Sequence, residues 1–254
     1  MPELPEVETV RRGLEPLLVG RRIARVHVLD PRLVQPADPR DVERLLRGRE
    51  IAAVSRRGKY LILECGDRDL VAVHHLRMTG SFAGPGQPEP THVRMRYVVD
   101  GLDGEIRYND PRRFGTLAIG TRAEITQHLD ARLGPEPLDP AWDASQLHAR
   151  TKGRAAPLKA VLLDQRVVAG LGNIYVDEAC FLAAVRPDLS ADRVSRVAAG
   201  RLVEAIRARL TEAIDVGGST LRDYRGVEGT EGGMQERFVA YGRAGKPCLT
   251  CGTT

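Results

Sequence analysis

Apolar and polar positions follow two different patterns along the chain, and the change of pattern divides it. From about Pro5 to Leu18, apolar side chains recur at helical spacing, which predicts one amphipathic helix. Short β-rich runs follow, separated by the turn signals "RRGK", "GLDG" and "NDP", and many such runs at close intervals predict an antiparallel sandwich or barrel. We expect strands in "RIARVHVLD", "REIAAVS", "KYLILECG", "DLVAVHHL", "HVRMRYVVD", "EIRYND" and "GTLAIG".

A proline-rich stretch separates this region from a helical one. "LGPEPLDPAWD" holds three prolines in eleven residues and interrupts helices and strands, so we interpret it as a linker. Beyond it, "APLKAVLLDQ", "NIYVDEACFLAA" and "SRVAAGRLVEAIRARLTEAI" carry helical patterns, and a glycine-rich loop leads to a strand-like "RFVAYGR". The sequence thus predicts an α+β chain with four parts: a β-sandwich with an N-terminal helix (1–130), a linker (131–143), a helical domain (144–240) and a cysteine-containing tail (241–254).

The charge balance favours polyanions only mildly. The 254 residues include 38 basic and 34 acidic side chains, for a formal net charge of +4. The basic residues gather in short stretches such as "RRGK", "DPRRFG" and "ARTKGR", as in strands and loops that face a phosphate backbone, although ordinary solvated surface would explain any one stretch. No apolar run approaches the ~18 residues of a membrane helix, and no leader is visible. We therefore expect a soluble cytoplasmic protein.

The four cysteines fall into two kinds. Cys65 and Cys180 each lie inside an apolar run, which predicts small buried core residues. Cys248 and Cys251 have the C-x-x-C spacing of a zinc knuckle, in the glycine-flanked "GKPCLTCG".

The first residues raise a question that helix formation does not answer. Pro5 and Glu6 suit the first turn of a helix, because proline needs no N–H partner there and acids favour the positive end of the helix dipole. Pro2 and Glu3 lie upstream of that turn, so another role is needed for them.

Ordered motifs over nearly the whole chain closely resemble the formamidopyrimidine-DNA glycosylase family, bacterial base-excision enzymes that remove oxidised purines. The motifs are "PELPEVE", "RRGKYLIL", "HLRMTG", "YNDPRRFG", "LGPEPL", "GLGNIYVDE", "GGSTLRDY" and "AYGR". The resemblance implies that the helical domain contains a helix-two-turns-helix DNA-binding element and that the tail begins a zinc finger.

The resemblance assigns catalysis to the start of the chain. Once Met1 is removed, the secondary amine of Pro2 is partly neutral near physiological pH and can attack the sugar carbon that bears the damaged base. The resulting iminium acidifies the neighbouring sugar proton and permits strand cleavage by β,δ-elimination. Glu3 would act as general acid and Glu6 would position the site. Lys59, in the "RRGKY" turn, would hold a phosphate or donate a proton, although a surface lysine is the simpler reading of the turn alone.

A base inside duplex DNA must be extruded before it can be excised, and the gap in the stack must be filled. The resemblance assigns this to three wedge residues: Met78 as an apolar filler, Arg112 as a cation for the orphaned base, and Phe114 as an aromatic wedge. Without it, Met78 would be assigned to the core and Phe114 to a strand. The scarcity of phenylalanine, four in the chain, and the position of this one in an arginine loop favour its exposure.

Further contacts to the DNA backbone are implied at His92, Arg154 and Asn173. Asn173 follows "GLG" at a predicted helix start, where backbone N–H groups can bind phosphate; a simple N-cap is the other interpretation, and both can hold. Lys159, on the preceding helix, is a weaker candidate for the lesion pocket.

Zinc is the cofactor that the resemblance implies, but the chain departs from the family at its C-terminus. Family members complete a four-cysteine finger with a second C-x-x-C pair, whereas this sequence ends three residues after Cys251. Cys248 and Cys251 supply two of the four ligands, so we expect either a truncated finger or a member that dispenses with the metal. Cys65 and Cys180 could in principle substitute, but their apolar runs predict that they are buried in other elements.

The main prediction is a monomeric bacterial DNA glycosylase and apurinic-site lyase that acts on duplex DNA with oxidised purines. One alternative is an endonuclease VIII-like enzyme for oxidised pyrimidines, against which "PELPEVE" and the three wedge residues argue. The other is a catalytically silent protein that binds damaged DNA.

Overall fold

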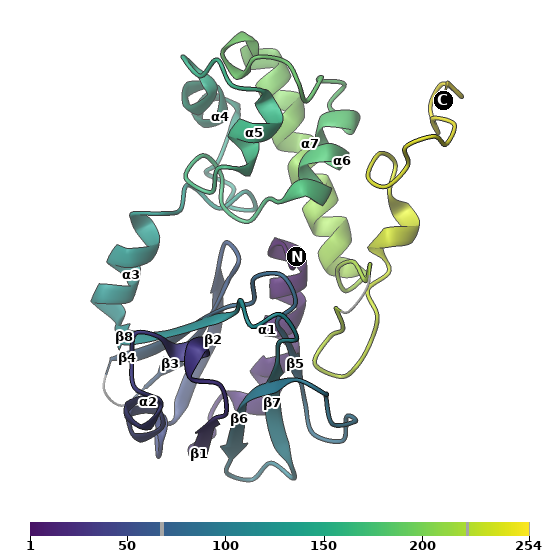
Figure 1. Cartoon of the computed structure of the whole chain (residues 1–254). Helices are drawn as coiled ribbons and strands as arrows, with labels where there is room; N and C mark the ends of the chain where they lie inside the picture. The colour runs from purple at the N-terminus through teal and green to yellow at the C-terminus, as the bar shows by residue number, and fades with distance from the viewer. Residues whose placement is uncertain (67–68, 222–223, 254) are drawn as a thin grey trace.

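The computed structural model describes residues 1–66, 69–221 and 224–253. Strands fill one half of the molecule and helices α4 to α7 the other, and the N-terminus lies where the halves meet (Figure 1). Among the described residues, no helix combines the length and the apolar character that crossing a membrane requires.

The first half is an antiparallel β-sandwich, as predicted. Its two four-stranded sheets have the orders β1-β6-β7-β5 and β2-β3-β4-β8. Every predicted run contains a strand; β5, which follows "HLRMTG", was not predicted because three residues are too few to show alternation. The strands are β1 (Ile23–Val28), β2 (Ile51–Arg57), β3 (Tyr60–Cys65), β4 (Leu70–His75), β5 (Ser81–Ala83), β6 (Val93–Val99), β7 (Glu105–Asn109) and β8 (Thr116–Thr121).

Alternating burial along the strands builds the sandwich core. In β3, Leu61, Leu63 and Cys65 are buried while the residues between them are not, and β6 alternates in the same way. The N-terminal helix α1 (Leu4–Leu18) packs its apolar face, including Val7 and Val10, into this core. It begins one residue before the predicted Pro5.

Two short helices of this half were not predicted. Helix α2 (Pro39–Leu46) begins behind an Asp38 cap with proline in its first turn, and α3 (Arg122–Asp130) begins with a capping box of Thr121 and Glu124. These start signals are visible in the sequence, but each helix is too short for its periodicity to stand out.

The second half is helical, as predicted, although its first helix, α4, was not expected. Its helices are α4 (Ala144–Thr151), α5 (Leu158–Leu163), α6 (Asn173–Leu182) and α7 (Arg196–Asp215), with 3₁₀ turns at Pro31–Val34 in the sandwich half and at Ala191–Arg193 and Met234–Arg237 here. Leu202, Ile206 and Leu210 of α7 pack with the buried face of α6, and Cys180 is part of this core. Residues 131–143 form no helix or strand.

Each half contributes a side chain to the core of the other. Leu4 of α1 is buried in the helical core, while Val227, in the loop after α7, is buried in the sandwich core. This exchange holds the first turn of α1 at the junction of the two halves.

The prediction of a strand in "RFVAYGR" was wrong. Its residues form the end of a 3₁₀ turn and then bends and turns. The reason is a buried carboxylate: Glu178 of α6 accepts the backbone N–H groups of Val239, Ala240 and Tyr241, so these amides have no need of a neighbouring strand.

Candidate functional site

A cavity of about 370 Å³ opens at the junction of the two halves, next to the start of the chain. Pro2 is buried at its wall, and Met1 is 48% exposed. The lining comes from α1, the β4–β5 loop, the β7–β8 loop, α6 and the segment after α7: Met1, Pro2, Glu6, Met78, Thr79, Gly80, Arg112, Ile174, Ser219, Leu221, Tyr224 and Tyr241.

Glu3 lies beside Pro2 and is only 2% exposed. Its carboxylate accepts the backbone N–H of Gly172 at 2.6 Å and that of Ile174 at 2.9 Å, at the start of α6. Burial raises the pKa of Glu3 to about 7, although the Lys59 ammonium and these N–H groups oppose the rise. Glu3 is therefore a carboxyl that can carry and release a proton near neutral pH.

The start of α6 differs from the prediction in two respects. Its N-cap is Gly172 rather than Asn173, and its first N–H groups bind the Glu3 carboxylate rather than a free phosphate. A Cβ on residue 172 would overlap that carboxylate, and one on residue 170, where φ is +88°, would overlap Leu4. The two glycines of "GLG" therefore allow Glu3 and Leu4 to pack against this backbone. Asn173 itself is exposed at the N-terminus of the helix.

Glu6 links three segments around the cavity. One carboxylate oxygen accepts the Glu3 N–H at 2.8 Å; the other accepts the Tyr175 hydroxyl at 2.8 Å and both the N–H and the hydroxyl of Ser219. A residue that only begins a helix would not need the last three bonds. They join α1 to α6 and to the segment after α7, which is the geometry of a residue that positions the wall of the cavity.

Lys59 is buried, which rules out the surface-lysine interpretation. It is 5% exposed, in the turn between β2 and β3. Burial lowers the pKa of its ammonium, and the nearby Glu3 and Glu6 carboxylates oppose that change. The structure thus brings the predicted Lys59 to the two predicted carboxylates.

The three wedge residues are exposed on neighbouring loops. Met78 is 41% and Phe114 is 51% exposed, and the Arg112 guanidinium lies 4.8 Å from the centre of the Phe114 ring. Arg77 and Arg113, which adjoin them, have φ values of +55° and +60°. Non-glycine residues with such backbone angles are strained and concentrate at functional sites.

Asp110 joins the two wedge loops, and sequence reasoning missed it. This buried carboxylate accepts the Thr79 hydroxyl from the β4–β5 loop, and from its own loop the N–H groups of Arg112 at 3.2 Å and Gly115 at 2.7 Å. The signal was present in "NDPRRFG", because an aspartate before proline commonly accepts the N–H two residues on.

Tyr108 packs beneath the same two loops. A Cβ on Gly80 or Gly115 would overlap its hydroxyl, so both loops can close over the buried ring only with glycine at their bases. The wedge residues therefore stand on a fixed base.

The other predicted DNA contacts lie at the surface. His92 and Arg154 are exposed, and Arg154 forms an ion pair with Asp164 at 3.3 Å. Lys159 does not line the cavity: its ammonium lies 2.8 Å from the Asp177 carboxylate, which holds it on the α5–α6 surface.

Cys248 and Cys251 do not make up a zinc site by themselves. Their segment is a turn in which the Thr250 N–H donates to the Cys248 sulfur at 3.4 Å. Across the described ranges 1–66, 69–221 and 224–253, no three His, Cys, Asp or Glu side chains are grouped so as to hold a metal ion. Cys65 and Cys180 are buried in the two cores, so the residues present fit only half of a tetrahedral site.

Both halves of the chain match models of one class of protein, the DNA glycosylases with a helix-two-turns-helix domain. Residues 1–117 match the formamidopyrimidine-DNA glycosylase N-terminal domain, and residues 133–225 match the formamidopyrimidine-DNA glycosylase H2TH domain.

Full-length similarity agrees with these matches. The formamidopyrimidine-DNA glycosylase of Rhodospirillum rubrum is 48% identical over 99% of this chain and 90% of its own length, and that of Hahella chejuensis is 43% identical over 100% and 93%. The chain therefore belongs to the formamidopyrimidine-DNA glycosylase family.

Solved structures share the fold. The crystal structure of the MutM (Fpg) protein of Thermus thermophilus has a TM-score of 0.88 at 43% identity, covering 99% of this chain and 91% of that one. A Lactococcus lactis Fpg mutant in complex with DNA containing Fapy-dG has a TM-score of 0.90 at 37% identity, covering 99% and 92%. The two-sheet sandwich and helical half are thus the family fold.

Proposed function

We propose that this protein is a DNA glycosylase of base excision repair that removes oxidised purines from duplex DNA and cleaves the strand as a lyase. The observation that supports the proposal is the position of Pro2 beside Glu3, whose pKa of about 7 suits a general acid. Pro2 lines a cavity whose wall also includes the wedge residues Met78 and Arg112. The solved complex of Lactococcus lactis Fpg with DNA containing Fapy-dG supports the choice of substrate.

In the proposed reaction the freed Pro2 nitrogen attacks the sugar carbon, and the bond from that carbon to the base breaks. Protonated Glu3 supplies the proton that the departing base or ring oxygen requires. The bond from the same carbon to the ring oxygen then breaks. The departing base and the ring oxygen take up two protons, one from Glu3 and one from the Pro2 N–H, and the opened sugar is left joined to Pro2 as an iminium. Loss of the adjacent sugar proton expels one phosphate, and a second elimination expels the other, which releases a cleaved strand.

The remaining residues hold the reactants. Glu6 fixes the cavity wall through Tyr175 and Ser219, and Lys59 supplies a buried cation for a phosphate or a proton in the eliminations. Met78, Arg112 and Phe114 fill the gap that the extruded base leaves. His92, Arg154 and Asn173 contact the DNA backbone from the surface.

The test compares two duplexes that differ only in the lesion, one with 8-oxoguanine and one with 5-hydroxyuracil. We expect faster cleavage of the 8-oxoguanine strand, with phosphate on both new ends. Faster cleavage of the pyrimidine lesion would support the endonuclease VIII-like alternative, and tight binding with no excision would support a silent damage-binding protein.

We also propose that this chain holds zinc weakly, since two thiolates leave two positions of a tetrahedral site to water. Metal analysis of the purified protein tests this. One zinc ion per chain that survives mild chelation would show that another group completes the site.

For the organisation of the chain, we propose the units 1–130, 131–143, 144–240 and 241–254; the two separate hydrophobic cores support the first and third. We propose that the protein acts as a monomer on DNA in the bacterial cytoplasm, in line with the bacterial source of its relatives. Limited proteolysis with size measurement tests the units and the monomer.

A further inference from the structure

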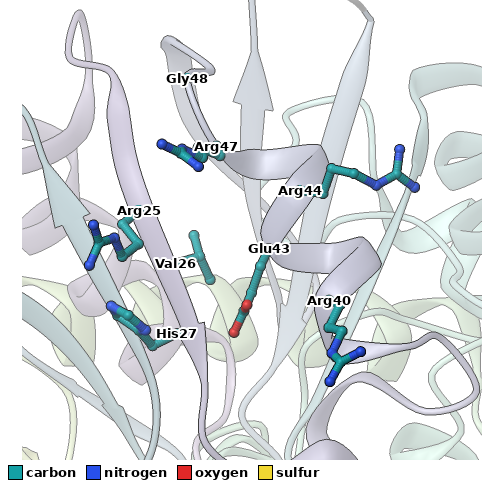
Figure 2. Close-up of a pocket in the computed structure, with 8 residues that line it drawn as sticks. All are labelled: Arg25, Val26, His27, Arg40, Glu43, Arg44, Arg47 and Gly48. Carbon is teal, nitrogen blue, oxygen red and sulfur yellow. The ribbon is translucent and has the colours of Figure 1, made fainter.

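A second hollow lies between strand β1 and helix α2, on the sandwich half. It measures about 670 Å³ and shares no lining residue with the Pro2 cavity. Its lining is Arg25, Val26, His27, Arg40, Glu43, Arg44, Arg47 and Gly48 (Figure 2). We call this surface the β1–α2 groove.

The groove carries excess positive charge. Within the described part of the chain, only Arg44 of its four arginines has an acidic partner, Asp41 at 2.8 Å. The single carboxylate of the lining, Glu43, uses one oxygen to accept the Val28 N–H at 2.8 Å, which ties α2 to β1. Arg25, Arg40 and Arg47 are exposed, and no described residue offers their side chains a hydrogen bond or ion pair.

Unpartnered arginines are uncommon elsewhere in the described chain. Most of its arginine side chains bind a carboxylate or a backbone carbonyl of the protein. Those without a hydrogen bond or ion pair are Arg25, Arg32, Arg40, Arg47, Arg77, Arg112 and Arg193. Two of them belong to the wedge loops, which the proposed function places against DNA, and four lie between the start of β1 and the C-cap residue of α2. Guanidinium groups without a hydrogen bond or an ion pair thus gather at the wedge and at the groove.

The arrangement of the groove suits a line of phosphates. Figure 2 shows Arg25 on the strand side, and Arg40 and Arg47 at opposite ends of α2, with guanidinium groups that do not point to a common centre. One small anion would need convergent donors, whereas a nucleic-acid backbone presents one charge about every 3.4 Å along each strand. The segment just beyond β1 contacts a wedge loop, because Asp30 forms an ion pair with Arg113 at 2.5 Å.

We propose that the β1–α2 groove is a second DNA-binding surface, which takes backbone phosphates that lie outside the lesion cavity. The inference rests on the proposed function for the presence of DNA. The phosphates belong either to the flanking arm of the same duplex or to a second duplex segment. Each arginine neutralises one phosphate and releases counterions, so the groove steepens the salt dependence of binding to long DNA without taking part in excision.

The test uses the triple variant Arg25→Gln, Arg40→Gln and Arg47→Gln. Its matched control is Arg22→Gln, Arg122→Gln and Arg186→Gln, which makes the same change in charge at exposed arginines with carboxylate partners. Affinity is measured against salt for a short duplex that fills only the lesion cleft and for one several helical turns long. On the long duplex, the groove variant should lose about 2–3 from the slope of log K against log salt, at 0.9 per phosphate. The control should lose none.

Two further arms identify the source of the phosphates and separate this proposal from the proposed function. If a separate undamaged duplex joins the complex of the parent with the short lesion duplex but not that of the groove variant, the groove binds a second segment; if it joins neither, the flanking arm is the ligand. An unchanged slope on the long duplex, or an equal loss on the short one, would overturn the proposal. Excision from the short duplex by both variants reports on the proposed function independently.

Discussion

The carboxylate of Glu3 accepts the backbone N–H of Gly172 at 2.6 Å, across the junction between the sandwich and the helical half. The contact joins the two halves, because the helix whose N–H groups hold Glu3 belongs to the helical half and Pro2 belongs to the sandwich half. A residue that replaces Glu3 must therefore still accept hydrogen bonds from the first N–H groups of α6.

Glu3→Gln should abolish most base excision and leave lesion binding in place. Glutamine keeps one acceptor oxygen but has no acidic proton to transfer, and general acid–base groups contribute about 10²–10⁴-fold. Glu8→Gln is the control, since Glu8 lies on the same helix and pairs with Arg11 at 2.9 Å, away from the cavity. Excision by Glu3→Gln at the parent rate would disprove the general-acid role.

The pKa of Glu3 should be about 7, and Lys59→Met should raise it further. The Lys59 cation stabilises the carboxylate, so its removal favours the protonated form, and the proton is then lost at higher pH. The ¹³C shift of the labelled Glu3 carboxyl, followed against pH, measures both values. Lys152→Met, at an exposed lysine, should leave them unchanged. A titration near the ordinary glutamate value, or a fall in the lysine variant, would contradict the electrostatic account.

The sequence predicted what repeats along the chain and missed what depends on contacts between distant segments. Helix α1, seven strands and the long α7 follow from periodicity. Of the residues assigned through the resemblance, Pro2, Glu6, Met78 and Arg112 line the cavity, whereas His92, Arg154, Lys159 and the two tail cysteines lie away from it. Glu178 could not be placed in this way, because it accepts N–H groups of a segment that only the fold brings near. The local turn of Asp110 was visible in the sequence, but its bond to the Thr79 hydroxyl of the other wedge loop was not. The N-terminus of α6 was misread for the same reason: its partner, Glu3, is far away in sequence.

Asp110→Asn should lower both the free energy of unfolding and the ability to open a damaged base pair. One acceptor oxygen becomes a donor that faces the N–H of Arg112 or Gly115, and an unsatisfied buried donor costs about 1–3 kcal/mol. Denaturant unfolding measures the first effect. The second is the ratio of 8-oxoguanine excision to cleavage of a preformed abasic site, which should fall. Asp103→Asn, in an exposed turn, is the control; an unchanged ratio in Asp110→Asn would mean that Asp110 only stabilises the fold.

Phe114→Ala should weaken discrimination between damaged and normal duplex more than overall DNA affinity. Stacking of an aromatic side chain on a base is worth about 1–3 kcal/mol, whereas phosphate contacts are untouched by the change. Titrations of an 8-oxoguanine duplex and its undamaged counterpart give the two affinities. Val197→Ala removes an exposed apolar side chain on α7 and should have no effect. Equal losses on both duplexes would argue against the wedge.

The central claim is that Pro2 is the nucleophile, and borohydride trapping on an 8-oxoguanine duplex tests it most directly. The reagent reduces the iminium to a stable amine, so protein whose Met1 has been removed should become joined to the cleaved strand. Pro2→Gly should be trapped much more slowly. Peptide mass spectrometry of the parent adduct should place the sugar on residue 2. An adduct on Lys59 or any other lysine, or excision that continues with no adduct at all, would contradict the account.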